Sequence, residues 1–244
     1  MNGLLIALQF LTRLPVTLKQ MPSAEQNGRS VLWYPLVGML IGIVLWLAHY
    51  LLDDVPAVLQ AALLLSLWVA MSGGLHLDGL ADSADAWAGG FGDKQRTLEI
   101  MKDPRSGPIA VVALLLLLLL KFAALMVLLG AASTSALLLA PLLARSALPL
   151  LFLTTPYVRK GGLGQALSSH LPRQHLPWLL AAVAGVSLVF IPAAWLALIT
   201  AGLVFVLCRQ LMLKHLGGTT GDTAGALLEI MECAIVVVLG CAAS

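Results

Sequence analysis

The chain has 244 residues, of which 60% are hydrophobic and only 11% are charged, with a formal net charge of +2. Soluble domains carry roughly 25% charged residues, so this composition excludes an ordinary water-soluble globule, whose core could not hide so much apolar surface. We therefore expect an all-α, polytopic integral membrane protein in which lipid covers many apolar side chains and residues 1–244 form a single domain.

The first apolar stretch, FLTRLPV at 10–16, holds Arg13 between hydrophobic side chains. This pattern is typical of an interfacial helix whose arginine reaches toward water. No cleavable signal peptide is expected, because residues 1–11 are short and lack a basic n-region. The next motif, YPLVGMLIG at 34–42, places small residues on one helix face and favours close packing with a neighbouring helix.

Six or seven apolar segments approach the roughly 20 residues that a helix needs to cross the hydrocarbon of a bilayer. These segments are 31–52, 57–73, 107–129, 133–153, 176–191, 193–213 and 224–243. The fifth and sixth are separated only by Pro192. Because the joint apolar run is too long for one ordinary span, we favour two helices over one kinked helix.

Twelve of the fourteen lysines and arginines lie before the first segment, at the connections after the second and fourth, or around the end of the sixth. They are Arg13, Lys19, Arg29, Lys94, Arg96, Lys102, Arg105, Arg159, Lys160, Arg173, Arg209 and Lys214. The other connections hold none, so by the positive-inside rule the N-terminus and the long connections are expected to face the cytoplasm. The two remaining basic residues, Lys121 and Arg145, fall inside predicted spans.

The strongest chemical signal follows the second segment, where residues 73–85 are GGLHLDGLADSAD. Asp78, Asp82 and Asp85 are spaced i, i+4 and i+7, so on a helix they share one face, and no Lys or Arg lies among them. Carboxylate oxygens suit Mg²⁺, which is usually shared with substrate phosphates. We interpret this face as a metal site, and a merely solvated acidic helix end is the alternative.

His76 lies in the same motif and is a candidate for phosphate binding, base contact or acid–base chemistry. A structural histidine is an equal alternative. The glycines Gly73, Gly74 and Gly79 would allow the backbone to approach a ligand closely.

A second candidate, MKDPRSGP at 101–108, opens the third segment. Its Asp-Pro pair ends any preceding helix. Arg105 and Ser106 then stand at the start of the next helix, which is a natural phosphate site, and Lys102 adds a positive charge. The alternative is a helix cap with charges that only set the topology.

A third candidate, GGTTGDTAG at 217–225, precedes the last segment. Gly217, Gly218 and Thr220 suggest an anion-binding turn for substrate, and Asp222 is either a fourth metal ligand or a helix cap. Glycine-rich turns are common, so this motif alone is a weak signal.

Glu229 and Glu232 give the last segment a polar stripe. Acids inside a span usually face the protein interior or an aqueous cavity. Lys121 and Arg145 are the plausible partners, and the sequence leaves structural ion pairing and catalysis equally open.

Five stretches together resemble the cobalamin synthase family, whose members act late in the vitamin B12 pathway. They cover nearly the whole chain in the family's order. The matching stretches are 10–16, 34–42, 73–85, 98–108 and 217–226. The chain departs from the family pattern at Ala86 and Ala110, where glycine often stands. Both replacements are small, so they weaken inferences about backbone contacts there but not about the aspartates.

The resemblance implies an enzyme that joins adenosylcobinamide-GDP to α-ribazole, or to its 5′-phosphate, giving adenosylcobalamin or its phosphate and GMP. It also implies Mg²⁺ as the cofactor, small-molecule substrates and no nucleic-acid partner. The implied location is the bacterial inner (cytoplasmic) membrane, and the charge pattern places the active site on its cytoplasmic side. Association into homo-oligomers is left open.

The implied chemistry assigns roles to residues of the three candidate motifs. Mg²⁺ would be bound by Asp78, Asp82, Asp85 and Asp222. Substrate would be contacted by Lys102, Arg105, Ser106, Gly217, Gly218 and Thr220. The catalytic groups would be His76 and a carboxylate base, either Asp82 or Asp85, between which the sequence does not choose.

Two other functions are weighed against this one. A CDP-alcohol phosphotransferase making phospholipid would carry D-x2-D-G-x2-A-R and then G-x3-D-x3-D, whereas the chain has DGLADSAD without the arginine or the second half. A cation or small-solute transporter would place acids at the membrane midplane and show broken helices in two matching halves. Most acids here lie instead on the predicted cytoplasmic side.

Overall fold

The structure, a computed structural model, describes residues 3–18, 20–159 and 163–243. Within these ranges all regular elements are helices, which confirms the expected all-α class. The helices are α1 (Gly3–Leu11), α2 (Ala24–Ser30), the short 3-10 helix η1 (Val31–Trp33), α3 (Tyr34–Leu51), α4 (Ala57–Ser72), α5 (Leu75–Gly89), α6 (Lys94–Ile100), α7 (Pro108–Gly130), α8 (Ser135–Thr154), α9 (Leu163–Ser169), α10 (Leu176–Phe190), α11 (Ala194–Leu216) and α12 (Gly221–Ala243).

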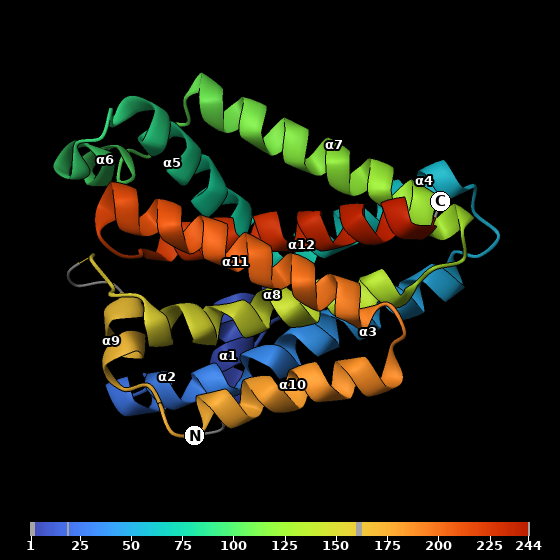
Figure 1. The fold of residues 1–244 in the computed structure, drawn as a ribbon, viewed down its shortest axis with the longest axis horizontal. Helices are drawn as coiled ribbons and strands as arrows, with labels where there is room; N and C mark the ends of the chain where they lie inside the picture. Colours follow the sequence, from blue (N-terminus) through green and yellow to red (C-terminus); the bar gives the residue numbers. More distant parts are fainter. Residues whose placement is uncertain (1–2, 19, 160–162, 244) are drawn as a thin grey trace.

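The long helices run roughly side by side, and their connections alternate between the two ends of the bundle (Figure 1). The α3–α4, α7–α8 and α10–α11 connections and the C-terminus lie at one end, on the right of the view. Helices α6 and α9 and the α11–α12 turn lie at the other end. This is the alternation that the basic residues predict, although Lys19 and Lys160 lie outside the described residues. The side of the membrane that each end faces stays a prediction.

Five helical segments in the described ranges are long and apolar enough to cross a membrane: residues 24–51, α7, α8, α11 and α12. A sixth is obtained if α4 and α5, whose axes are bent by 86° relative to each other, are counted together as one broken span. Because α5 carries the three aspartates, we place it outside the membrane-spanning segments. Alone, α4 with 16 residues and α10 with 15 reach about 24 and 22 Å, short of the roughly 30 Å of hydrocarbon, so the two remaining predicted spans are shorter apolar helices.

The predicted break between the fifth and sixth apolar segments is confirmed. Helix α10 ends at Phe190 and α11 begins at Ala194. Pro192 lies in the break, and it cannot continue α10 because it has no backbone N–H. Two helices, rather than one kinked helix, therefore cover this apolar run.

Helix α8 is the most enclosed of the long helices and packs against α3, α11 and α12. Its contact with α3 depends on two glycines. A Cβ at Gly38 would lie 2.3 Å from the carbonyl oxygen of Pro141, and one at Gly42 would lie 2.9 Å from that of Leu137. The small-residue face expected at 34–42 is therefore confirmed as a helix-packing face.

Four charged side chains are buried together between α7, α8 and α12. Lys121 Nζ lies 2.7 Å from a carboxylate oxygen of Glu229 and 2.7 Å from one of Glu232. Arg145 Nη1 contacts Glu232, and the Trp68 indole N–H donates to Glu232 at 3.1 Å. Each charged side chain is at most 5% exposed, so an unpaired charge here would be strongly destabilising. Of the two readings that the sequence leaves open, the structure therefore shows the ion pairing, with Lys121 on both acids and Arg145 on Glu232.

Gly73 and Gly74 make the sharp turn between α4 and α5, with left-handed φ values of 62° and 71°. A residue with a side chain would be strained at either position. The Arg13 side chain packs against Gly73, and the Arg13 backbone N–H donates to the Met71 carbonyl at 2.8 Å. These two glycines therefore set the direction in which α5 leaves α4.

Candidate active site at the contact of α5 and α12

The three aspartates of the GGLHLDGLADSAD motif lie on α5, as their spacing predicts. Asp78 is exposed, whereas Asp82 and Asp85 are partly buried. Leu77 and Leu80, also on α5, are buried in an apolar cluster with residues of α7 and α12. This packing fixes the rotation of α5 and hence the direction of its acidic face.

Two glycines bring α12 against α5. A Cβ at Gly79 would lie 2.6 Å from the carbonyl oxygen of Asp222, and one at Gly225 would lie 3.2 Å from the Cα of His76. The two helices therefore touch backbone to backbone, which places Asp222, in the first turn of α12, beside the acidic face of α5. Gly79 thus admits a neighbouring helix, and because it also lines the cavity described below, the predicted approach of a ligand there stays a prediction.

An arginine that the sequence did not single out completes this contact. Arg159 Nη1 lies 2.7 Å from Asp222 Oδ2, and the two side chains are 33% and 20% exposed. The chain just before Arg159 is held by the turn before α12, because Thr219 N donates to the Pro156 carbonyl at 2.8 Å and Val158 N donates to the Thr219 carbonyl at 3.0 Å. From the sequence alone, Arg159 is one of several loop cations that only set the topology.

A cavity of about 410 Å³ lies at this helix contact. Its lining includes the polar side chains of Gln9, His76, Asp78, Tyr157, Arg159 and Asp222. Apolar lining comes from α1, α5 and α8 through Phe10, Leu75, Leu148 and Phe152. Acidic, basic and aromatic groups thus surround a space of the size that small-molecule ligands occupy.

The carboxylates of Asp78 and Asp222 on the cavity wall and that of Asp82, which does not line the cavity, repel one another. Partial burial, followed by the charges of Asp78 and Asp222, raises the pKa of Asp82 from its usual 3.8 to about 6, and Arg159 offsets only part of this effect. Burial also raises the pKa of Tyr157, which lines the same cavity. A cation between Asp78, Asp82 and Asp222 would relieve this repulsion.

The four predicted metal ligands do not form one ready-made metal site. Among the described residues, no three His, Cys, Asp or Glu side chains gather closely enough to hold a metal ion by themselves. Asp222 does lie with Asp78 on the cavity wall, and both charges act on Asp82. The donor set fits an ion such as Mg²⁺ that takes one or two carboxylates and fills its other positions with water and phosphate oxygens.

Asp85 is turned toward a different partner. Its carboxylate accepts hydrogen bonds from the backbone N–H of Gly107, at 2.5 Å, and from that of Ala110, at 2.9 Å. These N–H groups belong to the free donors at the start of α7, so Asp85 acts as a long-range cap for that helix. Both oxygens of Asp85 are occupied by this contact.

His76 lines the cavity although the residue is only 5% exposed. Among the described residues, its Nδ1 atom has no hydrogen-bond partner. A buried polar atom without a partner costs free energy, and a ligand in the cavity could supply the missing bond. This position keeps the predicted role of His76 in substrate contact or acid–base chemistry open to test.

The predicted phosphate contacts at 101–108 lie away from the cavity wall. Lys102, Arg105 and Ser106 are exposed. Arg105 forms two side-chain hydrogen bonds with Asp103, at 2.9 and 2.6 Å. These bonds lower the pKa of the Asp103 carboxyl to about 2. The predicted substrate contacts of the three residues stay predictions.

The glycine- and threonine-rich turn supports the helices that surround the cavity. Gly217 ends α11 with a left-handed φ of 68°, and Gly218 packs directly on the Pro156 carbonyl. Thr220 is fully buried and its side-chain oxygen accepts a hydrogen bond from Thr223 N at 3.2 Å, which caps α12. The predicted contacts of Gly217, Gly218 and Thr220 with substrate remain untested.

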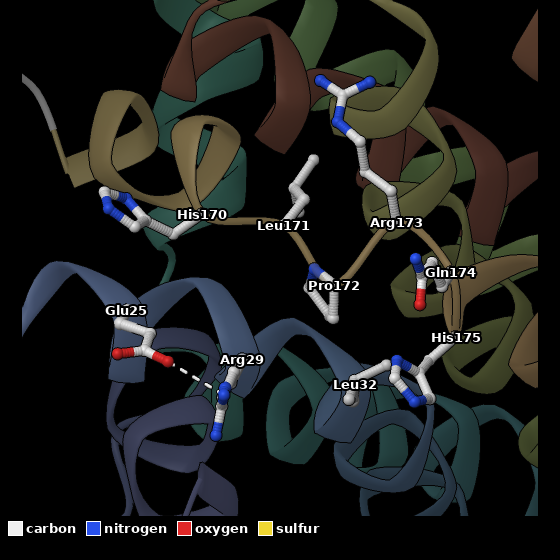
Figure 2. A pocket seen from close by; sticks show the side chains of 9 residues that line it. All are labelled: Glu25, Arg29, Leu32, His170, Leu171, Pro172, Arg173, Gln174 and His175. Atoms are coloured by element: carbon white, nitrogen blue, oxygen red, sulfur yellow. Dashed lines mark ion pairs between the residues drawn. The ribbon is translucent and has the colours of Figure 1, made fainter.

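A second, larger cleft of about 750 Å³ lies between α2 and the segment that joins α9 to α10 (Figure 2). In Figure 2, Glu25 and Arg29 point toward each other, and they form an ion pair at 2.8 Å. His170, Arg173 and His175 come from the opposite wall. All five of these side chains belong to exposed residues, and no predicted site residue lines the cleft, so we place the candidate active site at the α5–α12 contact.

Comparison with known proteins gives consistent sequence matches over nearly the whole chain. Residues 3–240 match the family model described as cobalamin-5-phosphate synthase. The chain is 65% identical over 234 residues to the adenosylcobinamide-GDP ribazoletransferase of Ectopseudomonas mendocina (strain ymp), covering 96% of each chain. It is 64% identical over 239 residues to the protein of that name from Pseudomonas paraeruginosa, covering 98% of each.

A third relative with the same name, from Stutzerimonas stutzeri, is 62% identical over 237 residues and 97% of each chain. No solved structure matches the chain significantly. Because the family model and these relatives extend over nearly the whole sequence, the chain belongs to the cobalamin-5-phosphate synthase family.

Proposed function

We propose that this enzyme transfers the phosphocobinamide part of adenosylcobinamide-GDP to α-ribazole or to α-ribazole 5′-phosphate and releases GMP. The substrates follow from the names of the relatives and of the family. The observation that carries the proposal is the cavity wall on which Asp78 of α5 and Asp222 of α12 lie together. Two acids from different helices beside a basic side chain suit a phosphate-transfer site.

Mg²⁺ is the proposed cofactor, and Asp78 and Asp222 are its proposed ligands, with Asp82 close enough for its charge to contribute. The fit of Mg²⁺ to these residues rests on the chemistry of the donor atoms. The carboxylate oxygens repel one another when no cation is between them, and two carboxylate ligands would leave positions on Mg²⁺ for phosphate oxygens. When bound, Mg²⁺ would neutralise the pyrophosphate and the departing GMP. Asp85 is left out of the ligand set, because its oxygens already accept N–H groups of α7.

In the proposed reaction a hydroxyl oxygen of the ribazole ribose bonds to the phosphorus attached to cobinamide. The bond from that phosphorus to the bridging oxygen breaks, and GMP leaves with the bond electrons. Asp82 is the proposed acceptor of the hydroxyl proton, because among the described residues its carboxylate oxygens make no hydrogen bond, unlike those of Asp85. His76 would donate or accept one hydrogen bond to substrate through Nδ1.

The proposed location is the bacterial inner membrane, with the cavity facing the cytoplasm. The support is the charge pattern of the chain, because most basic residues belong to the segments that share the end of α6 and α9. A cytoplasmic opening would admit nucleotide-linked substrates directly from the aqueous side.

The test is GMP release by the purified full-length protein in detergent or nanodiscs. Adenosylcobinamide-GDP is supplied with α-ribazole 5′-phosphate or with α-ribazole, in Mg²⁺ or in excess EDTA. We expect GMP and the corrinoid product in equal amounts, only with an acceptor and only with the metal. GMP release that is equally fast in EDTA and in Mg²⁺ would show that the metal is not needed. CMP release from a CDP-alcohol substrate, without GMP release from adenosylcobinamide-GDP, would replace the proposed function by that of a CDP-alcohol phosphotransferase.

A further inference from the structure

We propose that Arg159 exchanges partners during the reaction: a divalent cation takes over Asp222, and the freed guanidinium holds a phosphate group of a substrate. The inference rests on the proposed function and deepens it by naming the residue that recognises phosphate. It concerns an arginine outside every motif that the sequence singled out.

The first support is the position of Arg159. It lines the 410 Å³ cavity together with Asp78 and Asp222, and no Lys or other Arg side chain lines this cavity within the described ranges. A phosphate group in the cavity needs a cationic partner besides the metal, and arginine is the side chain best shaped for it. Arg159 is therefore the available phosphate contact.

The second support is that the other candidate cations are already engaged or placed elsewhere. Lys121 is paired with Glu229 and Glu232, and Arg145 is paired with Glu232 through Nη1 alone, but both are buried and neither lines the cavity. Arg105 is bound to its own neighbour, Asp103, at the surface. For any of these three cations to bind a phosphate group in the cavity, it would first have to break an ion pair that lies outside the cavity.

The third support is the form of the ion pair itself. The pair between Arg159 and Asp222 is a single contact through Nη1. A guanidinium carries five N–H donors, so most of its hydrogen-bonding capacity is not used by Asp222. With a third of its side chain exposed, Arg159 can turn to a new acceptor without leaving a deeply buried environment.

The fourth support is the charge balance. Asp78, Asp82 and Asp222 carry three negative charges within electrostatic reach of one another, and Arg159 supplies one positive charge. A divalent cation would balance the remaining two charges. It would also compete with Arg159 for Asp222, so metal binding at Asp222 and release of Arg159 are linked events.

The backbone before Arg159 keeps the side chain near both partners. The bonds between Thr219 and the 156–158 segment attach this part of the chain to the start of α12. The exchange therefore needs only a side-chain movement, with the backbone of Val158 staying in place.

The test uses Arg159→Gln in the full-length protein, with Mn²⁺ as a spectroscopic probe of the metal site. We expect Mn²⁺ to bind roughly two- to fivefold more tightly than in wild type, because Asp222 loses its competing cation. We expect KM for the phosphate-bearing substrate to rise by about tenfold or more. A merely structural role for Arg159 would weaken both Mn²⁺ binding and substrate binding. Tighter Mn²⁺ binding together with a higher KM therefore identifies the exchange.

Three comparisons sharpen the test. Arg159→Lys keeps the charge, so its Mn²⁺ affinity should stay near wild type while its KM rises less than that of the glutamine variant. Arg173→Gln, an exposed arginine in the second cleft, is the matched control and should change neither quantity. KM measured for the donor, for α-ribazole 5′-phosphate and for α-ribazole tells which phosphate Arg159 holds.

An increase confined to α-ribazole 5′-phosphate places Arg159 on the acceptor phosphate, and an increase confined to the donor places it on the pyrophosphate. Unchanged Mn²⁺ affinity in Arg159→Gln, or weaker Mn²⁺ binding, would overturn the exchange even if the wild type releases GMP as proposed. Tighter Mn²⁺ binding in a protein that forms no GMP would support the competition at Asp222 while overturning the proposed function.

Discussion

The carboxylate of Asp85 accepts a hydrogen bond of 2.9 Å from the backbone N–H of Ala110, 25 residues further along the chain. The same carboxylate accepts the N–H of Gly107. A residue that belongs by spacing to the acidic face of α5 therefore serves the first turn of α7. This contact separates Asp85, which caps α7, from Asp78 of the same motif, which lines the cavity.

Replacing Asp85 by Ala should lower stability more than it lowers metal affinity. Loss of a helix-capping side chain costs about 1 kcal/mol, which corresponds to a fall in Tm of roughly 2–4 °C for a chain of this size. Thermal unfolding in detergent and Mn²⁺ titration measure the two effects. Abolished Mn²⁺ binding with an unchanged Tm would instead make Asp85 a metal ligand.

Replacing Gly79 by Ala should damage the site through the contact between helices. The added methyl would lie 2.6 Å from the carbonyl oxygen of Asp222, so α12 must move away from α5 at a cost of about 1–3 kcal/mol. We expect weaker Mn²⁺ binding and at least tenfold slower GMP release. The matched control is Gly185→Ala in α10, where a Cβ would meet no atom within 4 Å, and equal losses in both variants would contradict the account.

Replacing His76 by Phe tests whether its free Nδ1 serves a substrate. If it does, kcat/KM should fall by about 100-fold while the Mn²⁺ affinity and Tm change little. The physical reason is that an apolar ring cannot supply the hydrogen bond that a ligand in the cavity would make. Wild-type kinetics in this variant would identify His76 as a structural residue of α5.

Replacing Glu232 by Gln should strongly destabilise the bundle. Glu232 accepts contacts from Lys121, Arg145 and Trp68, and breaking a buried pair costs about 3–5 kcal/mol because it leaves an uncompensated charge. The double variant Lys121→Met/Glu232→Gln restores the charge balance and should recover part of the lost stability. Identical unfolding temperatures for the single and double variants would show that charge balance does not matter there.

How far the sequence predicts this structure depends on the range of each interaction. The spacing of Asp78 and Asp82 is a local property, so their common helix follows directly from the helical repeat. The pairing of Lys121 with Glu229 could also be expected, because a charge inside an apolar span requires an opposite charge somewhere in the interior. The composition alone is enough to predict the polytopic all-α class.

The roles of Asp85 and Arg159 could not be predicted, since each depends on a partner far along the chain. Spacing places Asp85 on the face of α5 but says nothing about how close the start of α7 comes. Arg159 lies 63 residues before Asp222, and its loop position indicates only a topology signal. The sequence likewise marks Gly79 as a position of close approach but does not say which backbone approaches it.

The most direct test of the central claim compares Asp222→Asn with wild type in Mn²⁺ binding and in Mg²⁺-dependent GMP release. Asp54→Asn, an exposed acid in the α3–α4 connection, is the matched control. The account predicts at least tenfold weaker Mn²⁺ binding and roughly 100-fold slower GMP release for Asp222→Asn, with wild-type behaviour for the control. Wild-type Mn²⁺ affinity and wild-type GMP release in Asp222→Asn would contradict a metal-dependent site built where α5 meets α12.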